Sequence, residues 1–227
     1  MFLFDRYIPI SHFLDHHLKD KNKKVNTLII PPICDFYFFK TIDSSNQFHQ
    51  PYFLYCGSAA YYEVVEFIID SFKKIKNNDT THLHLVLNGI KSEELKNLLK
   101  ENNDKVKVFS NLDYNDLIRL YKNAFALLIP LRNTKQDEGR FPQKICEYLA
   151  SEKTVISTNF GEVKFYFKDM VNALIAKDYD VASYSEKMQW ALSNVQYLKI
   201  IEEEAYKTGK DFFDITSYKE TIKHFTK

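Results

Sequence analysis

The amino-acid sequence predicts an α/β domain in which helices cover both faces of a parallel sheet of about six strands. From residue 51 onward, short β-rich apolar runs alternate with longer stretches of helical period, the pattern of a doubly wound sheet. The chain has 227 residues, of which 45% are hydrophobic. It is therefore long enough to bury a substantial core.

Six segments are predicted to be strands because each is a short apolar run flanked by turn residues or by the end of a helical pattern. They are residues 52–56, 83–87, 106–109, 125–129, 155–157 and 173–175. In sheets of this kind, ligands bind beyond the carboxyl ends of the strands. The loops after residues 56, 87, 129 and 157 are therefore where a site is expected.

Three apolar stripes of helical spacing lie between these segments and predict helices that pack onto the sheet. Ser92 and Asp113 each precede a stripe and are typical N-cap residues. The stripes are Val64, Phe67, Ile68, Phe72 and Ile75; Leu95, Leu98 and Leu99; and Leu117, Leu120 and Tyr121.

Residues 1–50 break this rhythm. They contain one helical stretch after Ser11, a lysine-rich turn and an apolar run over residues 27–30 that ends at two prolines. Residues 41–50 are polar and lack a clear period, which is typical of a linker. We therefore predict three parts: residues 1–50 as the end of a preceding domain with a linker, residues 51–200 as the α/β domain, and residues 201–227 as C-terminal helices.

Charge and composition exclude several classes of function. The 31 basic residues nearly balance the 30 acidic ones, and no RNA-binding motif occurs, so we expect no nucleic-acid partner. No apolar run approaches the roughly 20 residues of a membrane span, and the amino terminus lacks the features of a signal peptide. The expected location is the cytoplasm, with peripheral contact at the inner face of the membrane left open.

Metal and cofactor sites are also not expected. The three cysteines are widely spaced and are interpreted as reduced thiols in the core. His12, His16 and His17 lie within one predicted helix, where a solvated face explains them better than a metal site. His82 and His84 alternate along a strand and are interpreted as residues on the sheet surface.

The most informative segment runs from Glu138 to residue 150. Pro142 suits the first turn of a helix, where its missing N–H costs nothing. The free N–H groups of that helix and the positive end of its dipole would then face the crevice beside Arg140 and Lys144. This combination predicts a binding site for a diphosphate.

Glu147 lies five residues after Pro142 among apolar neighbours, so its carboxylate is predicted to be partly buried and to need hydrogen-bond donors. Two vicinal ribose hydroxyls would supply such a pair. The alternative is a glutamate on the helix surface that pairs with Lys144 or Ser151.

These segments resemble the retaining group-1 glycosyltransferases of GT-B fold, in their C-terminal, nucleotide-sugar-binding domain, which is Rossmann-like. The likeness covers nearly the whole chain. Its strongest part is an ordered block formed by residues 140–150 (RFPQKICEYLA) and 155–163 (VISTNFGEV). Further matches are residues 11–14, 29–35, 54–57, 87–89 and 116–131.

The resemblance implies that Glu147 is the second acid of the E-x7-E motif, which holds the nucleotide ribose. It implies a nucleoside-diphosphate sugar as donor, a glycan or lipid-linked acceptor, retention of configuration, an N-terminal GT-B domain as partner, and no cofactor or metal. Glu138 and Lys144 are the candidate catalytic residues. The candidate donor-binding residues are Glu147, Arg140, Lys144, Gly57, Asn88, Gly89 and Phe141.

The sequence departs from the family pattern at two places. The first acid of the motif falls on Gly139, and Glu138, one residue earlier, is expected to replace it if Gly139 adopts a backbone turn closed to other residues. Residues 58–63 lack the Arg and Lys that bind phosphates in the family, so phosphate binding would rest on Arg140, Lys144 or Arg132. A non-catalytic binding module is the main alternative. An epimerase would need more acid/base side chains.

Overall fold

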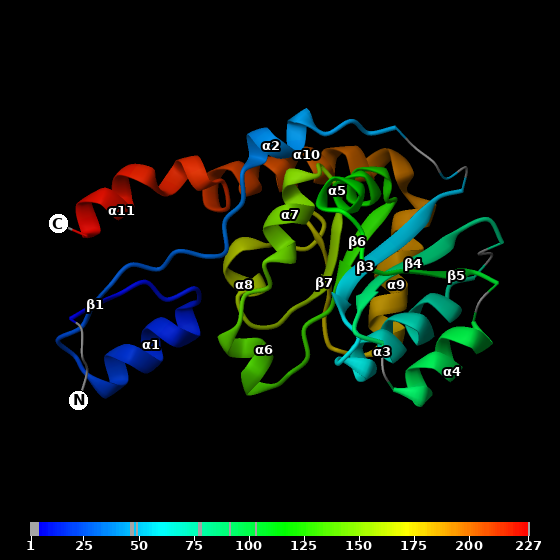
Figure 1. The fold of residues 1–227 in the computed structure, drawn as a ribbon, viewed down its shortest axis with the longest axis horizontal. Helices are drawn as coiled ribbons and strands as arrows, with labels where there is room; N and C mark the ends of the chain where they lie inside the picture. The colour runs from blue at the N-terminus through cyan, green and yellow to red at the C-terminus, as the bar shows by residue number, and fades with distance from the viewer. Residues whose placement is uncertain are drawn as a thin grey trace.

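The computed structural model describes residues 5–45, 48, 50–76, 79–90, 92–102 and 104–226. Its centre is a six-stranded parallel sheet with the strand order β5-β4-β3-β6-β7-β8 (Figure 1). The strands are β3 (Tyr52–Ser58), β4 (His82–Asn88), β5 (Val106–Phe109), β6 (Ala126–Ile129), β7 (Val155–Thr158) and β8 (Leu174–Ala176). The predicted fold class is confirmed, and every predicted strand occurs.

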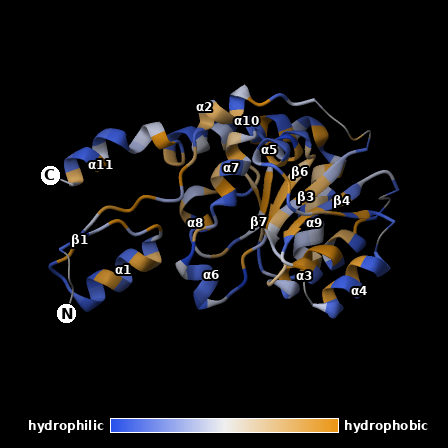
Figure 2. Cartoon of the chain, in the orientation of Figure 1, coloured by the Kyte–Doolittle hydropathy of each residue, from blue (hydrophilic) through white to orange (hydrophobic). Residues whose placement is uncertain are grey.

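Helices cover both faces of this sheet, whose apolar strands run through the centre of Figure 2. One face carries α2 (Phe36–Thr41), α5 (Tyr114–Asn123) and α7 (Lys144–Ala150); the other carries α3 (Tyr62–Lys73), α4 (Glu93–Glu101) and α9 (Val181–Ser193). Helix α10 (Val195–Phe212) contributes to both cores. The three predicted apolar stripes pack onto the sheet. No helix in the described part of the chain has the length and apolar character needed to cross a membrane.

The predicted helix starts differ in their capping. The Ser92 hydroxyl accepts a hydrogen bond from the Leu95 N–H at 3.2 Å, so Ser92 caps α4 as predicted. Asp113 occupies the N-cap position of α5, but its side chain makes no capping bond. The loop after β6 contains a short helix, α6 (Lys135–Gly139), that the sequence reading did not predict.

The N-terminal residues form a separate unit, seen at the left of Figure 1. Strands β1 (Arg6–Tyr7) and β2 (Asn26–Thr27) pair in parallel and are joined by α1 (His12–Lys21), which Ser11 caps. The chain ends in the 3-10 helix η1 (Ile215–Tyr218) and in α11 (Lys219–Phe225). The predicted boundary at residue 200 falls inside α10, and residues 46, 47 and 49 of the predicted linker lie outside the described residues.

His84 is buried, which corrects its interpretation as a residue on the sheet surface. Its side chain stacks on Tyr52 with ring centroids 4.0 Å apart, and Phe48 packs against it at 4.7 Å. The expectation failed because residue 48, far away in sequence, folds over the strand. Burial lowers the pKa of His84 to about 3, since a charged imidazole would lose its hydration there.

We predict that His84 makes stability depend on pH. The folded protein keeps this imidazole neutral down to about pH 3, whereas the unfolded chain takes up the proton near the ordinary histidine pKa of about 6.5. The His84 contribution is therefore complete above about pH 6.5 and is lost as the pH falls below it. Urea unfolding between pH 4 and 7 should show a steeper loss in the wild type than in His84→Phe, by at most about 1.4 kcal/mol per pH unit. An equal pH dependence of the free energy of unfolding in the two proteins would contradict the prediction.

Candidate functional site

A pocket of about 350 Å³ lies beyond the carboxyl ends of β3, β4 and β6, where the sequence places the site loops. Four candidate residues line it: Gly57, Asn88, Arg140 and Lys144. Four other candidates, Glu138, Glu147, Phe141 and Gly89, lie outside its lining. The remaining lining residues are Tyr55, Cys56, Ser58, Tyr61, Val64, Val86, Leu112, Leu117, Ile129, Pro130, Leu131 and Pro142.

The ends of β3 and β4 form one wall of the pocket. A Cβ at Gly57 would lie 2.2 Å from the Tyr55 hydroxyl oxygen, so a larger residue there would displace the Tyr55 ring. Asn88 fastens the end of β4 to the loop after β5, since its side-chain oxygen accepts a hydrogen bond from the Asn111 N–H at 3.2 Å. Gly89 follows Asn88 and does not line the pocket.

The opposite wall is the segment after β6, and the end of β7 fixes Leu131 in this segment. Thr158 Oγ1 both accepts a hydrogen bond from the Leu131 N–H, at 2.8 Å, and donates one to the Leu131 carbonyl, at 2.6 Å. Helix α6 then starts at a Thr134 cap, whose hydroxyl accepts from the Asp137 N–H at 3.2 Å. These bonds fix Arg132 and Asp137 relative to the sheet.

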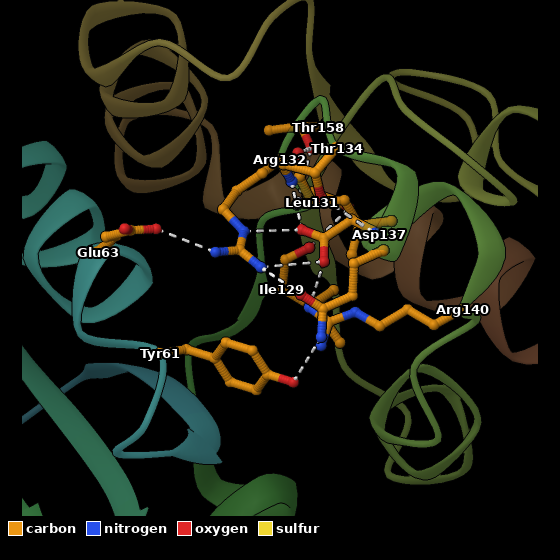
Figure 3. A network of polar contacts seen from close by, with 11 residues as sticks. Tyr61, Glu63, Ile129, Leu131, Arg132, Thr134, Asp137, Arg140 and Thr158 are labelled. Carbon is orange, nitrogen blue, oxygen red and sulfur yellow. Dashed lines mark hydrogen bonds and ion pairs between the residues drawn. The ribbon is translucent and has the colours of Figure 1, made fainter.

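Asp137 is the centre of the polar network drawn in Figure 3. Its side chain is fully buried, and its carboxylate accepts hydrogen bonds from the Arg132 N–H at 2.8 Å and from Arg132 Nε at 3.0 Å. Arg140 reaches the same carboxylate, with 2.9 Å between its NH2 nitrogen and Asp137 Oδ1. One buried acid therefore holds both arginines.

The two guanidinium groups lie over the ring of Tyr61, as Figure 3 shows, at 5.4 Å for Arg132 and 4.9 Å for Arg140. Arg132 also pairs with Glu63 at 3.1 Å, near the start of α3. The hydrogen bonds to Asp137 raise the pKa of Arg132, because they favour the charged guanidinium. Tyr61 and Glu63 thus meet the arginines from the β3–α3 side of the pocket.

Lys144 and Glu147 form the third charged group of the site. Lys144 Nζ lies 3.0 Å from Glu147 Oε2, and the Tyr121 hydroxyl donates to the same oxygen at 3.3 Å. Glu147 is 6% exposed, so its predicted burial is confirmed, while the predicted alternative of a pair with Lys144 is also present. Helix α7 begins at Lys144, so Pro142 lies two residues before the helix and not in its first turn as predicted, and the side chain of the N-cap residue Gln143 makes no capping bond.

Phe141, a candidate donor-binding residue, packs in the core with 3% of its surface exposed and does not line the pocket. Its ring stacks on Tyr166 at 5.2 Å and meets the edge of Phe213 at 5.5 Å. These partners lie far away in sequence, and therefore the local pattern did not reveal them.

Gly139 lies at the end of α6 and faces α1. A Cβ there would lie 3.2 Å from Phe13 Cδ1, and the Ser11 hydroxyl donates to the Gly139 carbonyl at 2.9 Å. Its φ is not positive, so the expected turn closed to other residues is wrong. Glu138, the preceding residue, is half-buried.

His12 does not lie on a solvated helix face as expected, because it contacts a buried carboxylate. The backbone N–H of His12 donates to the buried Glu162 at 2.8 Å, and its Nδ1 lies 2.9 Å from the second oxygen of that carboxylate. His16 and His17 are exposed. Within the described ranges, no group of three or more His, Cys, Asp or Glu could hold a metal ion. Cys34, Cys56 and Cys146 are free thiols.

The sequence analysis did not predict Asp137, Tyr61 or Glu63 as residues of the site. A signal for Asp137 was present, because Thr134 and Asp137 have the spacing of an N-cap residue and a first-turn acid, which marks a helix start. No comparable signal marks Tyr61 or Glu63, whose role depends on arginines about 70 residues later in the chain.

Comparison with known proteins gives a family and a fold. Residues 39–208 match the family model described as glycosyl transferases group 1. No curated protein sequence matches the chain. Similar solved structures include a glycosyltransferase from Rickettsia africae (TM-score 0.78, 18% identity) and Anabaena Alr3699/HepE in complex with UDP and glucose (TM-score 0.80, 13% identity). Each alignment covers 98% of this chain and 63% of the other, so the chain spans less than two thirds of those proteins.

We expect Glu63→Gln to raise the affinity of the pocket for inorganic pyrophosphate, by at most about fivefold, because an exposed ion pair is worth about 0.2–1 kcal/mol. The change removes the negative charge beside Arg132, while glutamine still offers an oxygen acceptor to its NH1 nitrogen. Calorimetry at low salt measures it. Glu66→Gln, one turn further along α3 and bonded to Tyr62 instead, is the matched control. Unchanged or weaker pyrophosphate binding in Glu63→Gln would refute the expectation.

Proposed function

We propose that this chain, which belongs to the group-1 glycosyltransferases, supplies the donor site of a retaining enzyme that transfers a sugar from a nucleoside-diphosphate sugar. The observation that carries the proposal is the arrangement of Arg140 and Lys144 in the pocket lining at the carboxyl ends of the strands, with the buried Glu147 carboxylate 3.0 Å from Lys144 Nζ. It combines cations for a diphosphate with a buried carboxylate for a ribose. Alr3699/HepE, a protein of similar fold, has been solved with UDP and glucose.

In this proposal Glu147 accepts hydrogen bonds from the ribose hydroxyls, while Arg140 and Lys144 bind the diphosphate. The Lys144 ammonium has three N–H donors, so it can contact a phosphate oxygen without leaving Glu147. Catalysis would come from positioning the donor and from stabilising the departing diphosphate. Neither step requires a cofactor or a metal from the protein.

The acceptor, a glycan or a lipid-linked glycan, would bind to an N-terminal GT-B domain. In support, β1 and β2 form a parallel sheet of only two strands, whereas parallel sheets normally have more strands and both faces covered. We propose residues 1–50 as the end of that domain with its linker, residues 51–200 as the donor domain and residues 201–227 as C-terminal helices. The proposed location is the cytoplasm, at the inner face of the membrane.

A non-catalytic nucleotide-sugar-binding module is the second candidate. It is favoured by Gly139 at the position of the first acid and by the charge balance of the pocket. Arg132, Arg140 and Lys144 are each paired with a carboxylate, from Glu63, Asp137 or Glu147. Turnover in the presence of the N-terminal domain separates this candidate from the enzyme.

The proposal predicts that Glu147→Gln weakens binding of a nucleoside diphosphate by about 1.5–3 kcal/mol, the range for hydrogen bonds to a charged group. Glutamine keeps the packing and an acceptor for Tyr121, so the melting temperature reports whether the fold is retained. Calorimetry with UDP, ADP and GDP measures the affinity. Glu203→Ala on the exposed side of α10 is the control. Equal nucleoside-diphosphate affinity of the wild type and Glu147→Gln would contradict the assignment of Glu147 as the ribose-binding residue.

A separate prediction concerns Glu138, which we propose contacts the transferred sugar from the end of α6, in place of the acid missing at Gly139, although Gly139 lacks the backbone turn expected there. Glu138→Gln should lower turnover of the sugar donor but leave the affinity for the free nucleoside diphosphate unchanged, because the contact is made only to the transferred group. Both quantities are measured on the protein assembled with its N-terminal domain. Unchanged turnover, or an equal loss of nucleotide affinity, would remove Glu138 from the mechanism.

A further inference from the structure

The two arginines held by Asp137 differ in how many of their hydrogen-bond donors are already used. Arg132 donates from its backbone N–H and from Nε to Asp137, and its terminal nitrogens reach Glu63, Gln136 and Asp137. All three side-chain nitrogens of Arg132 are therefore bonded within the protein. Its side chain is 14% exposed, and Arg132 does not line the pocket.

Arg140 is the arginine that has donors to offer. It lines the pocket and contacts Asp137 through one terminal nitrogen, at 2.9 Å. Its Nε is buried and has no hydrogen-bond partner within the described residues. A buried N–H without an acceptor costs free energy. The Arg140 side chain as a whole is 31% exposed and lines the pocket, so it can still meet a ligand oxygen there.

Asp137 and Tyr61 together restrict the position of the Arg140 guanidinium. Asp137 fixes one end of the group, while the ring of Tyr61 faces it at 4.9 Å. Asp137 is itself held by the Arg132 backbone and side chain, so it has little freedom to follow Arg140 if that residue turns away. Figure 3 shows the carboxylate between the two guanidinium groups.

We propose that Asp137 is the positioning residue of the donor site, which holds the Arg140 guanidinium in place for the diphosphate before the ligand arrives. The proposal rests on the proposed function and adds a residue to it. Arg132 balances the charge of Asp137, so Arg140 keeps its positive charge for the ligand. Because a free arginine side chain loses rotamer entropy when it binds a ligand, holding it beforehand lowers the cost of binding.

If Asp137 only neutralised charge, its removal would change the diphosphate affinity in the opposite direction. If Asp137 served only as a counter-ion, its removal would make the pocket more positive and strengthen binding of a diphosphate. If it positions Arg140, its removal weakens that binding although the pocket becomes more positive. The direction of the change therefore decides between the two roles.

The test is calorimetry with the tightest binder among UDP, ADP and GDP, and with the corresponding bare nucleoside. Asp137→Asn should weaken diphosphate binding at least tenfold and leave nucleoside binding within twofold of the wild type. In an Arg140→Gln background, Asp137→Asn should add less than a twofold loss, because the residue acts through Arg140. Asp70→Asn, in an exposed pair with Lys73 on α3, is the control.

Unchanged or tighter diphosphate binding in Asp137→Asn, or an equal loss in both backgrounds, would overturn the proposal. If the wild type binds none of the three nucleotides, the proposed function fails with it; if the wild type binds and Asp137→Asn binds equally well, only the role of Asp137 fails. Should Asp137→Asn not fold, nitrogen-15 relaxation of the Arg140 Nε–H in the ligand-free wild type decides. A rigid group supports the proposal, and an order parameter below about 0.6 overturns it.

Discussion

The burial of a parallel sheet on both faces is the constraint on which the rest of this structure depends. Parallel strands need helices on either side, and here α5 and α7 cover one face while α3, α4 and α9 cover the other. The strand side chains therefore pack into two hydrophobic cores, one on each face of the sheet. Polar chemistry is left to the loops at the carboxyl ends, and the pocket lies there because the end of β3 is flanked by the ends of β4 and β6.

The charges of that pocket are balanced within the protein, which distinguishes it from a simple cluster of cations. Arg132 and Arg140 share Asp137, Arg132 also meets the mostly exposed Glu63, and Lys144 meets Glu147. The long-range attraction of an anion is weakened by this balance, because opposite charges a few ångströms apart nearly cancel at a distance. Close contact is different, since Arg140 lines the pocket and its contact with Asp137 holds its guanidinium at a fixed place. Such a site gains affinity from geometry more than from net charge.

The sequence predicted the sheet well because strand and helix periods are local properties. Strands β3 to β8 follow from apolar runs, and the stripe that begins at Val64 follows from helical spacing. The local pattern did not reveal the surroundings of residues that are buried by distant parts of the chain. His84 is buried by Phe48, and Phe141 by Phe213. For the site, the pattern located the cations and the burial of Glu147, but the network around Asp137 needs Tyr61 and Glu63 from another loop, a proximity that no local spacing encodes.

The N-terminal unit is coupled to the pocket through α6. Ser11 donates to the Gly139 carbonyl, Phe13 occupies the space beside Gly139, and His12 is held by the buried Glu162. A Cβ at residue 139 would lie 3.2 Å from Phe13 Cδ1, so the Phe13 ring would have to shift slightly, which favours glycine at the position where the family carries its first acid. Because α6 also holds Asp137 and Glu138, the docking of α1 and the geometry of the pocket depend on the same five-residue helix. A shift of the N-terminal unit would therefore act on the position of Asp137, and through Asp137 on Arg140.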